Sequence, residues 1–256
     1  MSDNTHTPDS AAEPDSAATP AARRPRRPGP ARSAAGLAAD LAYVARSRLG
    51  PLRYGMLPPP PNDPSRDAAR LPVLLIPGVF ESWHYLRTLG ERLAARGHPV
   101  HRVAELGLNR HPIEHAAHLL TDYVRERDLR DVALVCHSKG GLIGKAMLIA
   151  DAQSAPDQRR LTRLVTVNTP FAGTPVARWG LGPWREFRPE SAIIRTLDAR
   201  TDVNDRITSL VSAVDQYVPR AIAHLDGAEN VVLDRVGHFR VLGLPDVIDE
   251  IERRLP

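Results

Sequence analysis

The sequence DVALVCHSKGGLIGKAMLIA at residues 131–150 decides the fold of this chain. Residues 132–135 form a short apolar run with β-branched side chains, which predicts a buried strand. From residue 140 onward, apolar side chains recur at helical spacing and predict a helix. The residues between leave no room for a loop, so the chain must turn sharply at Ser138. We expect Ser138 to take a strained backbone conformation, with Gly140 and Gly141 making the turn possible.

The hydroxyl of Ser138 would stand clear of the sheet, above the positive end of a helix, where an attacking oxygen is useful. The pentapeptide C-H-S-K-G at residues 136–140 resembles the nucleophile elbow of α/β-hydrolases, whose pattern is G-x-S-x-G. Cys136 replaces the first glycine of that pattern, and cysteine is also small. The alternative is an ordinary strand-to-helix turn in which Ser138 is only the helix N-cap.

The length of the chain fits one domain of ordinary size plus extra segments. The chain has 256 residues and a formal net charge of +4. Lys139 and Lys145 are its only lysines, so the positive charge comes from arginine. Cys136 is the single cysteine, which excludes an intrachain disulfide. No apolar run approaches the length that a bilayer requires.

Residues 1–35 are dominated by proline, alanine, serine and charged residues, which predicts a disordered tail. Its arginine pairs suggest an export signal, but Asp40 interrupts the apolar stretch that follows, so we expect a cytoplasmic protein. A solvated tail is favoured over one that binds nucleic acid or anionic lipid. We therefore expect no nucleic-acid partner. Contact with a membrane is possible, but no sequence feature supports it. The sequence does not indicate the oligomeric state.

Residues 36–49 predict a short amphipathic helix, which we expect to pack on the domain rather than on a membrane. Residues 50–70 contain four consecutive prolines and predict an extended connector. The folded domain is expected to span residues 71–256, with a small cap inserted at about residues 172–206.

Within that domain, short apolar runs predict strands and longer amphipathic stretches predict helices. The predicted strands are residues 73–76, 99–103, 132–135, 161–167, 207–214 and 229–233. The predicted helices are residues 83–96, 112–127, 140–150 and 244–253. This alternation indicates βαβ units, and therefore a mostly parallel sheet with helices on both faces. It agrees with the α/β-hydrolase fold that the elbow suggests.

A serine nucleophile needs a base, and the base needs a carboxylate that orients it. In α/β-hydrolases these follow in the order Ser, acid, His, each after a strand. Asp215 directly follows the apolar run 207–214, and Asp-x-x-Val-Pro at 215–219 is similar to the acid loop of lipases. His238 follows the last predicted strand within Val-Gly-His-Phe at 236–239. We predict a catalytic triad of Ser138, Asp215 and His238.

The resemblance also implies an oxyanion hole made of backbone N–H groups. One donor is expected from Lys139, which follows the nucleophile. The second is expected from the turn after the first strand, Ile-Pro-Gly-Val-Phe at 76–80, with Val79 favoured and Phe80 as its rival. Lipases usually have His-Gly in this turn, whereas this chain has Pro-Gly. The missing histidine removes a side chain that often steadies the loop.

Further segments strengthen the resemblance to bacterial lipases and esterases. The segment Thr-Pro-Phe-Ala-Gly-Thr at 169–174 is similar to their T-P-x-x-G-T, and residues 189–197 are similar to their P-x-S-x-x-x-x-L stretch. Trp179, Trp184 and Phe187 lie in the expected cap, which implies either substrate contact or anchoring of the cap. We predict Phe80, Trp179 and Trp184 as substrate-binding residues.

Several other residues suggest functional roles that are less well supported than the triad. His-Pro-Ile-Glu-His at 111–115 matches a zinc-peptidase motif, but Pro112 at the start of the helix breaks the face that two ligands would share. His137 is expected to pack beneath the site, and Cys136 to be buried and inert. The Lys139 side chain either favours anionic substrates, pairs with an acid of the cap, or is simply solvated.

The sequence thus predicts a serine hydrolase of lipase or esterase type that cleaves an acyl ester, small or lipid, without metal or organic cofactor. Two alternatives stay open: other triad chemistry such as acyl transfer, and a non-catalytic protein that binds ligands in the same pocket. The sequence does not indicate the acyl length or the head group of the substrate.

Overall fold

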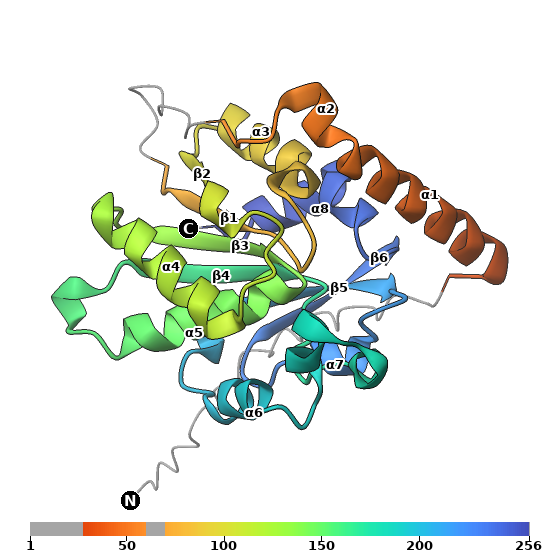
Figure 1. Cartoon of the computed structure of the whole chain (residues 1–256). Coiled ribbons are helices and arrows are strands. Elements are labelled where there is room, and N and C mark those ends of the chain that lie inside the picture. Colours follow the sequence, from red (N-terminus) through yellow and green to blue (C-terminus); the bar gives the residue numbers. More distant parts are fainter. Residues whose placement is uncertain (1–27, 60–69, 256) are drawn as a thin grey trace, which may run out of the picture.

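The computed structural model describes residues 28–59 and 70–255. Six strands form one parallel sheet in the order β2-β1-β3-β4-β5-β6 (Figure 1). The strands are β1 (Val73–Ile76), β2 (Val100–Arg102), β3 (Val132–His137), β4 (Leu161–Val167), β5 (Ile207–Val214) and β6 (Glu229–Val236). The chain leaves β1 toward β2 and then returns to β3 on the other side of β1. Such a reversal opens a crevice at the carboxyl ends of β1 and β3, where parallel sheets bind ligands.

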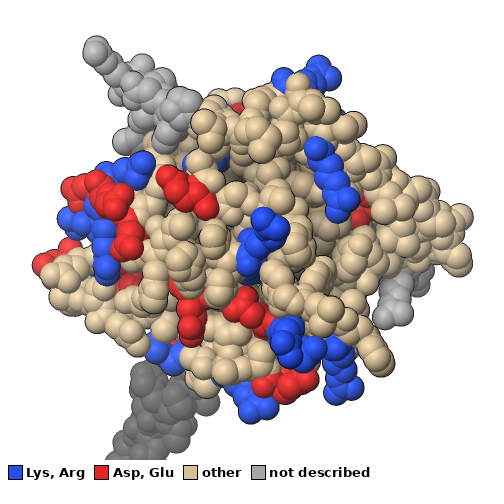
Figure 2. Space-filling view, viewed as in Figure 1, with Lys and Arg blue, Asp and Glu red and all other residues tan. Residues whose placement is uncertain are grey.

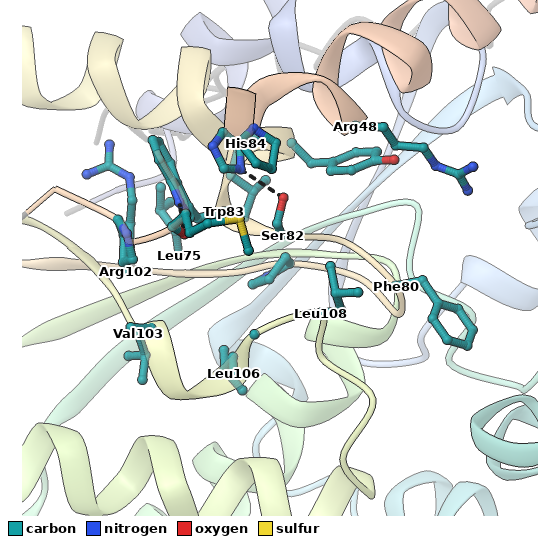
Figure 3. A pocket seen from close by; sticks show the side chains of 18 residues that line it. Arg48, Leu75, Phe80, Ser82, Trp83, His84, Arg102, Val103, Leu106 and Leu108 are labelled. Carbon is teal, nitrogen blue, oxygen red and sulfur yellow. Dashed lines mark hydrogen bonds between the residues drawn. The ribbon is translucent and has the colours of Figure 1, made fainter. Parts of the chain in front are cut away.

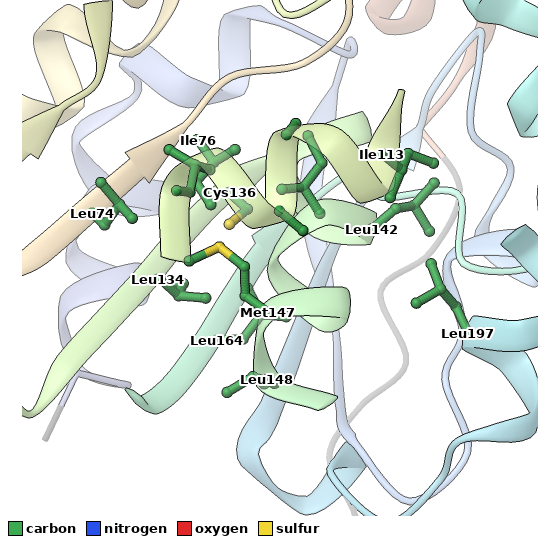
Figure 4. Packing of buried hydrophobic residues seen from close by; sticks show 14 of the residues in the cluster. Leu74, Ile76, Ile113, Leu134, Cys136, Leu142, Met147, Leu148, Leu164 and Leu197 are labelled. Atoms are coloured by element: carbon green, nitrogen blue, oxygen red, sulfur yellow. The ribbon is translucent and has the colours of Figure 1, made fainter. Parts of the chain in front are cut away.

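Helices cover both faces of the sheet, as the alternating pattern predicted (Figure 1). One face is covered by α4 (Ile113–Glu126) and α5 (Lys139–Ala152). The other is covered by α3 (Arg87–Ala95) and α8 (Pro245–Glu252). Successive strand residues point to opposite faces, so Leu74 and Ile76 pack on α4 and α5 (Figure 4), whereas Val73 and Leu75 belong to the core beneath α3 and α8. Strand β1 is apolar throughout because both of its faces are buried, whereas β6, at the edge of the sheet, includes exposed polar residues.

The segment before the sheet departs from expectation. The tail predicted for residues 1–35 lies outside the described residues up to residue 27, and α1 (Pro30–Arg48) begins six residues earlier than residue 36. Pro30 suits a first helical turn, where a missing N–H costs nothing. A second short helix, α2 (Gly50–Tyr54), occupies part of the predicted connector. The first predicted helix of the domain divides into a 3₁₀ turn, η1 (Trp83–Leu86), and α3.

The predicted cap, residues 172–206, is built mainly from short turns. It contains the 3₁₀ turns η4 (Pro175–Trp179), η5 (Gly182–Phe187) and η6 (Asn204–Arg206), and the helix α6 (Ala192–Ala199). After β5 a short helix, α7 (Arg220–Ala223), precedes β6, which runs to Val236 rather than ending at residue 233. In the described part of the chain, no helix combines the length and the apolar character that crossing a membrane requires.

The junction of β3 and α5 has the sharp turn that the sequence predicts. Ser138 lies at its apex with φ 49° and ψ −119°, a conformation that non-glycine residues seldom adopt. Gly140 in the next turn passes so close to β1 that a Cβ atom there would lie 2.3 Å from the carbonyl oxygen of Ile76. A glycine is therefore required at residue 140, because backbone cannot move aside for a side chain.

Candidate active site

A pocket of about 320 Å³ lies at the carboxyl edge of the sheet, over the crevice between β1 and β3. Ser138 and His238 both line it, and Val79 and Phe80 line it from the turn after β1. Three further sets of residues complete its wall. They come from α1 (Asp40, Leu41, Val44, Arg48), from the cap (Thr174, Val176, Trp184, Phe187) and from the loop after β5 (Gln216, Tyr217, Val218).

Asp215 and His238 meet at the ends of β5 and β6. The Nδ1 atom of His238 is 2.7 Å from Oδ2 of Asp215, and both side chains are almost entirely buried. The other carboxylate oxygen, Oδ1, accepts the N–H groups of Tyr217 and Val218 at 2.7 and 2.8 Å. The carboxylate is therefore held in one orientation, and the pairing at Nδ1 leaves Nε2 of His238 as the ring nitrogen for other work.

The pKa of His238 reflects two opposing effects. Burial lowers it because an imidazolium loses hydration, but the charge and hydrogen bond of Asp215 raise it, with smaller contributions from Glu81 and Asp40. The carboxylates prevail, and the pKa of His238 lies above its ordinary value of 6.5. A base with such a pKa accepts a proton readily, and the nearby carboxylates stabilise the imidazolium that forms.

A buried polar network fixes the backbone of His238. Its carbonyl oxygen accepts a hydrogen bond from Nε2 of His137 at 3.0 Å and another from Nδ2 of Asn168 at 2.9 Å. The other nitrogen of His137 lies 2.9 Å from both carboxylate oxygens of Glu81. Glu81 also accepts the N–H of Gly78 at 2.9 Å. Glu81 and His137 thus join the turn after β1 to the histidine loop beneath the elbow.

A second anchor comes from α1. The carboxylate of Asp40 is fully buried and accepts the N–H groups of Phe239 and Arg240 at 2.8 and 2.7 Å. Its other oxygen accepts from Nε2 of Gln216 at 2.7 Å. Gly237, at φ +112°, lets the chain pass close to this carboxylate, since a Cβ atom there would lie 2.6 Å from Oδ1 of Asp40. One helical carboxylate therefore holds both the histidine loop and the acid loop.

The expected oxyanion donors lie beside the pocket. None of the backbone hydrogen bonds in the described part of the chain uses the N–H of Val79 or of Lys139. Val79 belongs to the turn after β1 and lines the same pocket as Ser138, and Lys139 follows Ser138 in the first turn of α5. The N–H of Gly78, in contrast, is occupied by Glu81. Phe80 has a positive φ of 59°, which marks this turn as a tightly constrained one.

Comparisons with known proteins agree with this architecture. No protein-family model and no curated protein matches the chain. Among solved structures, the mature lipase BlEst2 of Bacillus licheniformis is 17% identical, with a TM-score of 0.59 over 77% of this chain and 96% of that chain. An extracellular α/β-hydrolase from a Paenibacillus species is 16% identical, with a TM-score of 0.51 over 72% of this chain and 98% of that chain. This chain has the α/β-hydrolase fold.

A third structure, carboxylesterase CesB from Bacillus subtilis, is 12% identical, with a TM-score of 0.54 over 86% of this chain and 98% of that chain. Identities this low establish the α/β-hydrolase fold and nothing finer. The fold predicted from the elbow and the strand pattern is thereby confirmed. The catalytic assignments of Ser138, Asp215 and His238 stay predictions, for which the geometry above is the support.

On this α/β-hydrolase fold, the Lys139 side chain is neither solvated nor available to a substrate. It is fully buried and donates hydrogen bonds to the carbonyl oxygens of Asn109 and His111. Burial lowers its pKa from 10.5 to about 8, against the attraction of Glu186 in the cap. Of the three alternatives for Lys139, the solvated side chain is wrong, because the loop before α4 accepts its hydrogen bonds and covers the start of α5.

The two cap tryptophans have different positions. Trp184 lines the pocket as expected, with its ring 5.8 Å from that of Phe187. Trp179 is 91% exposed and does not contribute to this pocket. The close approach of Gly180 to Trp184 explains the difference, because η4 and η5 fold onto each other there and leave the neighbouring Trp179 outside. Trp179 therefore lies outside this pocket, and its role in substrate binding stays a prediction.

The competing residues have structural positions of their own. Cys136 is buried in the core, and burial raises the pKa of its thiol well above the usual value. His137 packs beneath the site, as described above. His111 precedes α4, and its ring lies 5.0 Å from that of His115. In the described residues, no group of three or more histidine, cysteine or acidic side chains is arranged to hold a metal ion.

Sequence reasoning missed the residues that support the site from outside it, namely Asp40, Glu81 and Asn168. A signal for Asp40 was present, since it interrupts an otherwise apolar helix face. Asn168 has a positive φ of 53° and donates to Ser212 as well as to the histidine loop. No sequence pattern indicated that Glu81 turns inward beneath the elbow.

Proposed function

We propose that this protein is a serine hydrolase that cleaves carboxylic esters through an acyl-enzyme. The observation that carries the proposal is the 2.7 Å contact between Asp215 and His238 in a pocket that Ser138 also lines, with Ser138 at a strained elbow. The lipase and carboxylesterase among its structural neighbours are consistent with it. The substrate we propose is an acyl ester, either small or lipid.

In the first half of the reaction, His238 takes the proton of Ser138 as the serine oxygen attacks the ester carbonyl. Asp215 then faces an imidazolium, which its charge stabilises. The negative oxygen of the tetrahedral intermediate accepts hydrogen bonds from the N–H groups of Val79 and Lys139. The start of α5 adds the positive end of its dipole at the same place.

In the second half, the imidazolium of His238 gives its proton to the departing alcohol, and an acyl group stays bonded to Ser138. Water then enters, loses a proton to His238 and attacks the acyl carbonyl. The intermediate collapses to release the carboxylic acid and restore the serine. This chemistry needs only side chains and backbone of the protein.

A fluorophosphonate probe tests the assignment, since it reacts only with an activated serine. We expect labelling of the wild type and its loss in Ser138→Ala, together with a fall of about 10⁴-fold or more in hydrolysis of p-nitrophenyl acetate. Ser154→Ala, at a partly exposed serine after α5 that does not line the pocket, is the matched control and should behave as the wild type.

Three other outcomes have distinct meanings. Labelling that persists in Ser138→Ala contradicts the assignment of the nucleophile. Labelling of Ser138 with acyl transfer to an added alcohol, but no release of acid, favours an acyltransferase. Absence of both labelling and hydrolysis in the wild type favours a protein that only binds ligands in this pocket.

A further inference from the structure

A second cavity, larger than the pocket above, lies beside it at the β1 and β2 edge of the sheet (Figure 3). Its volume is about 460 Å³, within the range of small-molecule sites. In Figure 3, Val103 and Leu106 lie on one side of the cavity, and Leu75, Trp83 and Ser82 on the other. The lining is mainly apolar, and Met56 and Pro58 from the segment after α2 contribute to it.

The polar side chains of this cavity are already engaged or directed elsewhere. Ser82 and Nδ1 of His84 lie 2.9 Å apart, and Nε2 of His84 lies 3.0 Å from the carbonyl oxygen of Gly55. The guanidinium of Arg102 points away from Val103 and Leu106 (Figure 3). The Nε atom of Arg102 has no hydrogen-bond partner in the described residues, but its Nη2 atom lies against Gly90 of α3. The lining that remains is mainly apolar, so an apolar occupant fits the cavity better than a polar one.

The two cavities adjoin each other. Arg48, Phe80 and Tyr85 line both of them. Phe80 is 38% exposed, and its ring is directed away from Val103 and Leu106, so it stands at the junction without filling the second cavity (Figure 3). The second cavity, which we call the side chamber, therefore lies next to the pocket that Ser138 lines.

The chemistry determines which part of an ester would point there. Along the carboxyl edge of the sheet, His238 follows β6, Ser138 follows β3, Val79 follows β1, and the side chamber lies at β1 and β2. His238 gives its proton to the leaving alcohol, so the alcohol must lie on the β6 side of Ser138. The acyl part then extends in the opposite direction, past the oxyanion donors and toward β2.

We propose that the side chamber binds the acyl chain of the substrate, and that the enzyme prefers unbranched acyl chains long enough to pass Phe80. This proposal rests on the proposed function. Each methylene moved from water into an apolar chamber favours the transition state by roughly fourfold. The catalytic pocket alone holds a short acyl group, whereas a longer one gains the additional contacts of the side chamber.

The test is the chain-length dependence of kcat/KM with p-nitrophenyl acetate, butyrate, octanoate and dodecanoate. We expect the wild type to hydrolyse octanoate at least about tenfold more efficiently than acetate. Ala104→Trp places an indole in the side chamber from an exposed position. It should lower the octanoate-to-acetate ratio by about tenfold or more, because several methylenes lose their site.

Two further variants keep the result interpretable. Leu108→Trp fills the same chamber from another partly exposed position and should lower the ratio in the same way. Ala155→Trp introduces the same side chain at an exposed residue after α5, away from both cavities, and should keep the wild-type ratio. Thermal unfolding shows whether each variant is folded.

The outcomes separate this proposal from the one it rests on. Wild-type protein that hydrolyses no ester, acetate included, overturns the proposed function. If the wild type hydrolyses p-nitrophenyl acetate but its kcat/KM does not change with acyl chain length, only the proposal that the side chamber binds the acyl chain is overturned. A wild-type preference for octanoate that survives both chamber-filling variants also overturns it and places the acyl chain elsewhere, for example under the cap.

Discussion

Asp40 and Glu81 are carboxylates that act on His238 without touching it. Asp40 holds the backbone of the residues after His238, and Glu81 acts through His137 on the carbonyl of His238 itself. Both also raise the pKa of His238, beyond the contribution of Asp215. We therefore regard Asp40 and Glu81 as positioning residues for the predicted base.

The raised pKa of His238 predicts an acid limb in the pH profile. The base must be neutral to accept a proton, so kcat/KM should fall as pH decreases through a midpoint above 6.5. Asp40→Asn removes one of the charges that raise this pKa, so the midpoint should move to lower pH. The same variant loses its bond with Gln216 and should reduce kcat by about tenfold. The pH dependence of kcat/KM with p-nitrophenyl acetate measures the shift of the midpoint, and saturation kinetics with the same ester measure kcat.

Asp226→Asn, which changes an exposed carboxylate away from the pocket, is the matched control and should keep the wild-type profile. An unshifted acid limb in Asp40→Asn contradicts the electrostatic role.

For stability the sign is the opposite of that for activity. A raised histidine pKa contributes stability that is complete below 6.5 and is lost as pH rises through the folded-state value.

At the scale of elements, the role of α1 in the structure differs most from the role that the sequence predicted. An amphipathic helix packed on the domain was expected, and the structure makes it a wall of the candidate active site. On the face of the molecule that Figure 2 shows, α1 carries few charged side chains over much of its length, whereas acidic and basic residues gather over one end of α4. Leu41, at the rim of the pocket, is 68% exposed.

The packing of α1 on β6 depends on Gly36. A Cβ atom at that position would lie 2.5 Å from Cβ of Val236, a branched side chain that cannot swing aside. Gly36→Val should therefore lower the free energy of unfolding by about 1–3 kcal/mol and loosen the histidine loop, with a corresponding loss of activity. Ala35→Val adds the same side chain one residue earlier, at an exposed position, and controls for helix propensity.

Urea unfolding measures the stability of the two variants, and hydrolysis of p-nitrophenyl acetate measures their activity. Equal stability and activity in Gly36→Val and Ala35→Val would mean that α1 is not held against β6 as described.

At the scale of the whole molecule, we expect a buried cation to lower the stability of the fold. Lys145 on α5 is fully buried, and in the described part of the chain its Nζ atom has no hydrogen-bond partner. Burial lowers its pKa from 10.5 to about 8, opposed by the attraction of Asp198 and Asp202 near α6. An uncompensated ammonium in the interior costs folding free energy.

Lys145→Met should therefore stabilise the protein by about 1–3 kcal/mol at neutral pH. The wild type should gain stability as pH rises from about 8 toward 10.5, because the unfolded chain binds more protons in that window, and Lys145→Met should lack this gain. Chemical denaturation at several pH values measures both. Arg195→Met, at an exposed position on α6, is the control. A less stable Lys145→Met would show that the lysine is compensated in the folded state.

Prediction from the sequence succeeded where the signal is local. The strand before Ser138, the close-packed Gly140 after it, and the positions of Asp215 and His238 directly after strands all follow from neighbouring residues. Because parallel strands end at one edge of the sheet, three residues distant in sequence were expected at one place. The sequence did not predict segments in which apolar residues do not recur at a regular spacing, namely the short turns of the cap and the start of α1. It also did not predict the outward position of Trp179.

What the sequence by itself determined is the alternation of strands and helices, and with it the α/β-hydrolase fold and the residues at its carboxyl edge. What only the tertiary structure decided is how that edge is supported and enclosed: the bond of Asp40 to Phe239 across 199 residues, the inward turn of Glu81, the burial of Lys139, and the chamber beside Phe80. The spacing of apolar residues along a segment indicates whether that segment forms a helix or a strand. The partner of a buried polar side chain is set by which elements the finished fold brings together, and no local pattern records it.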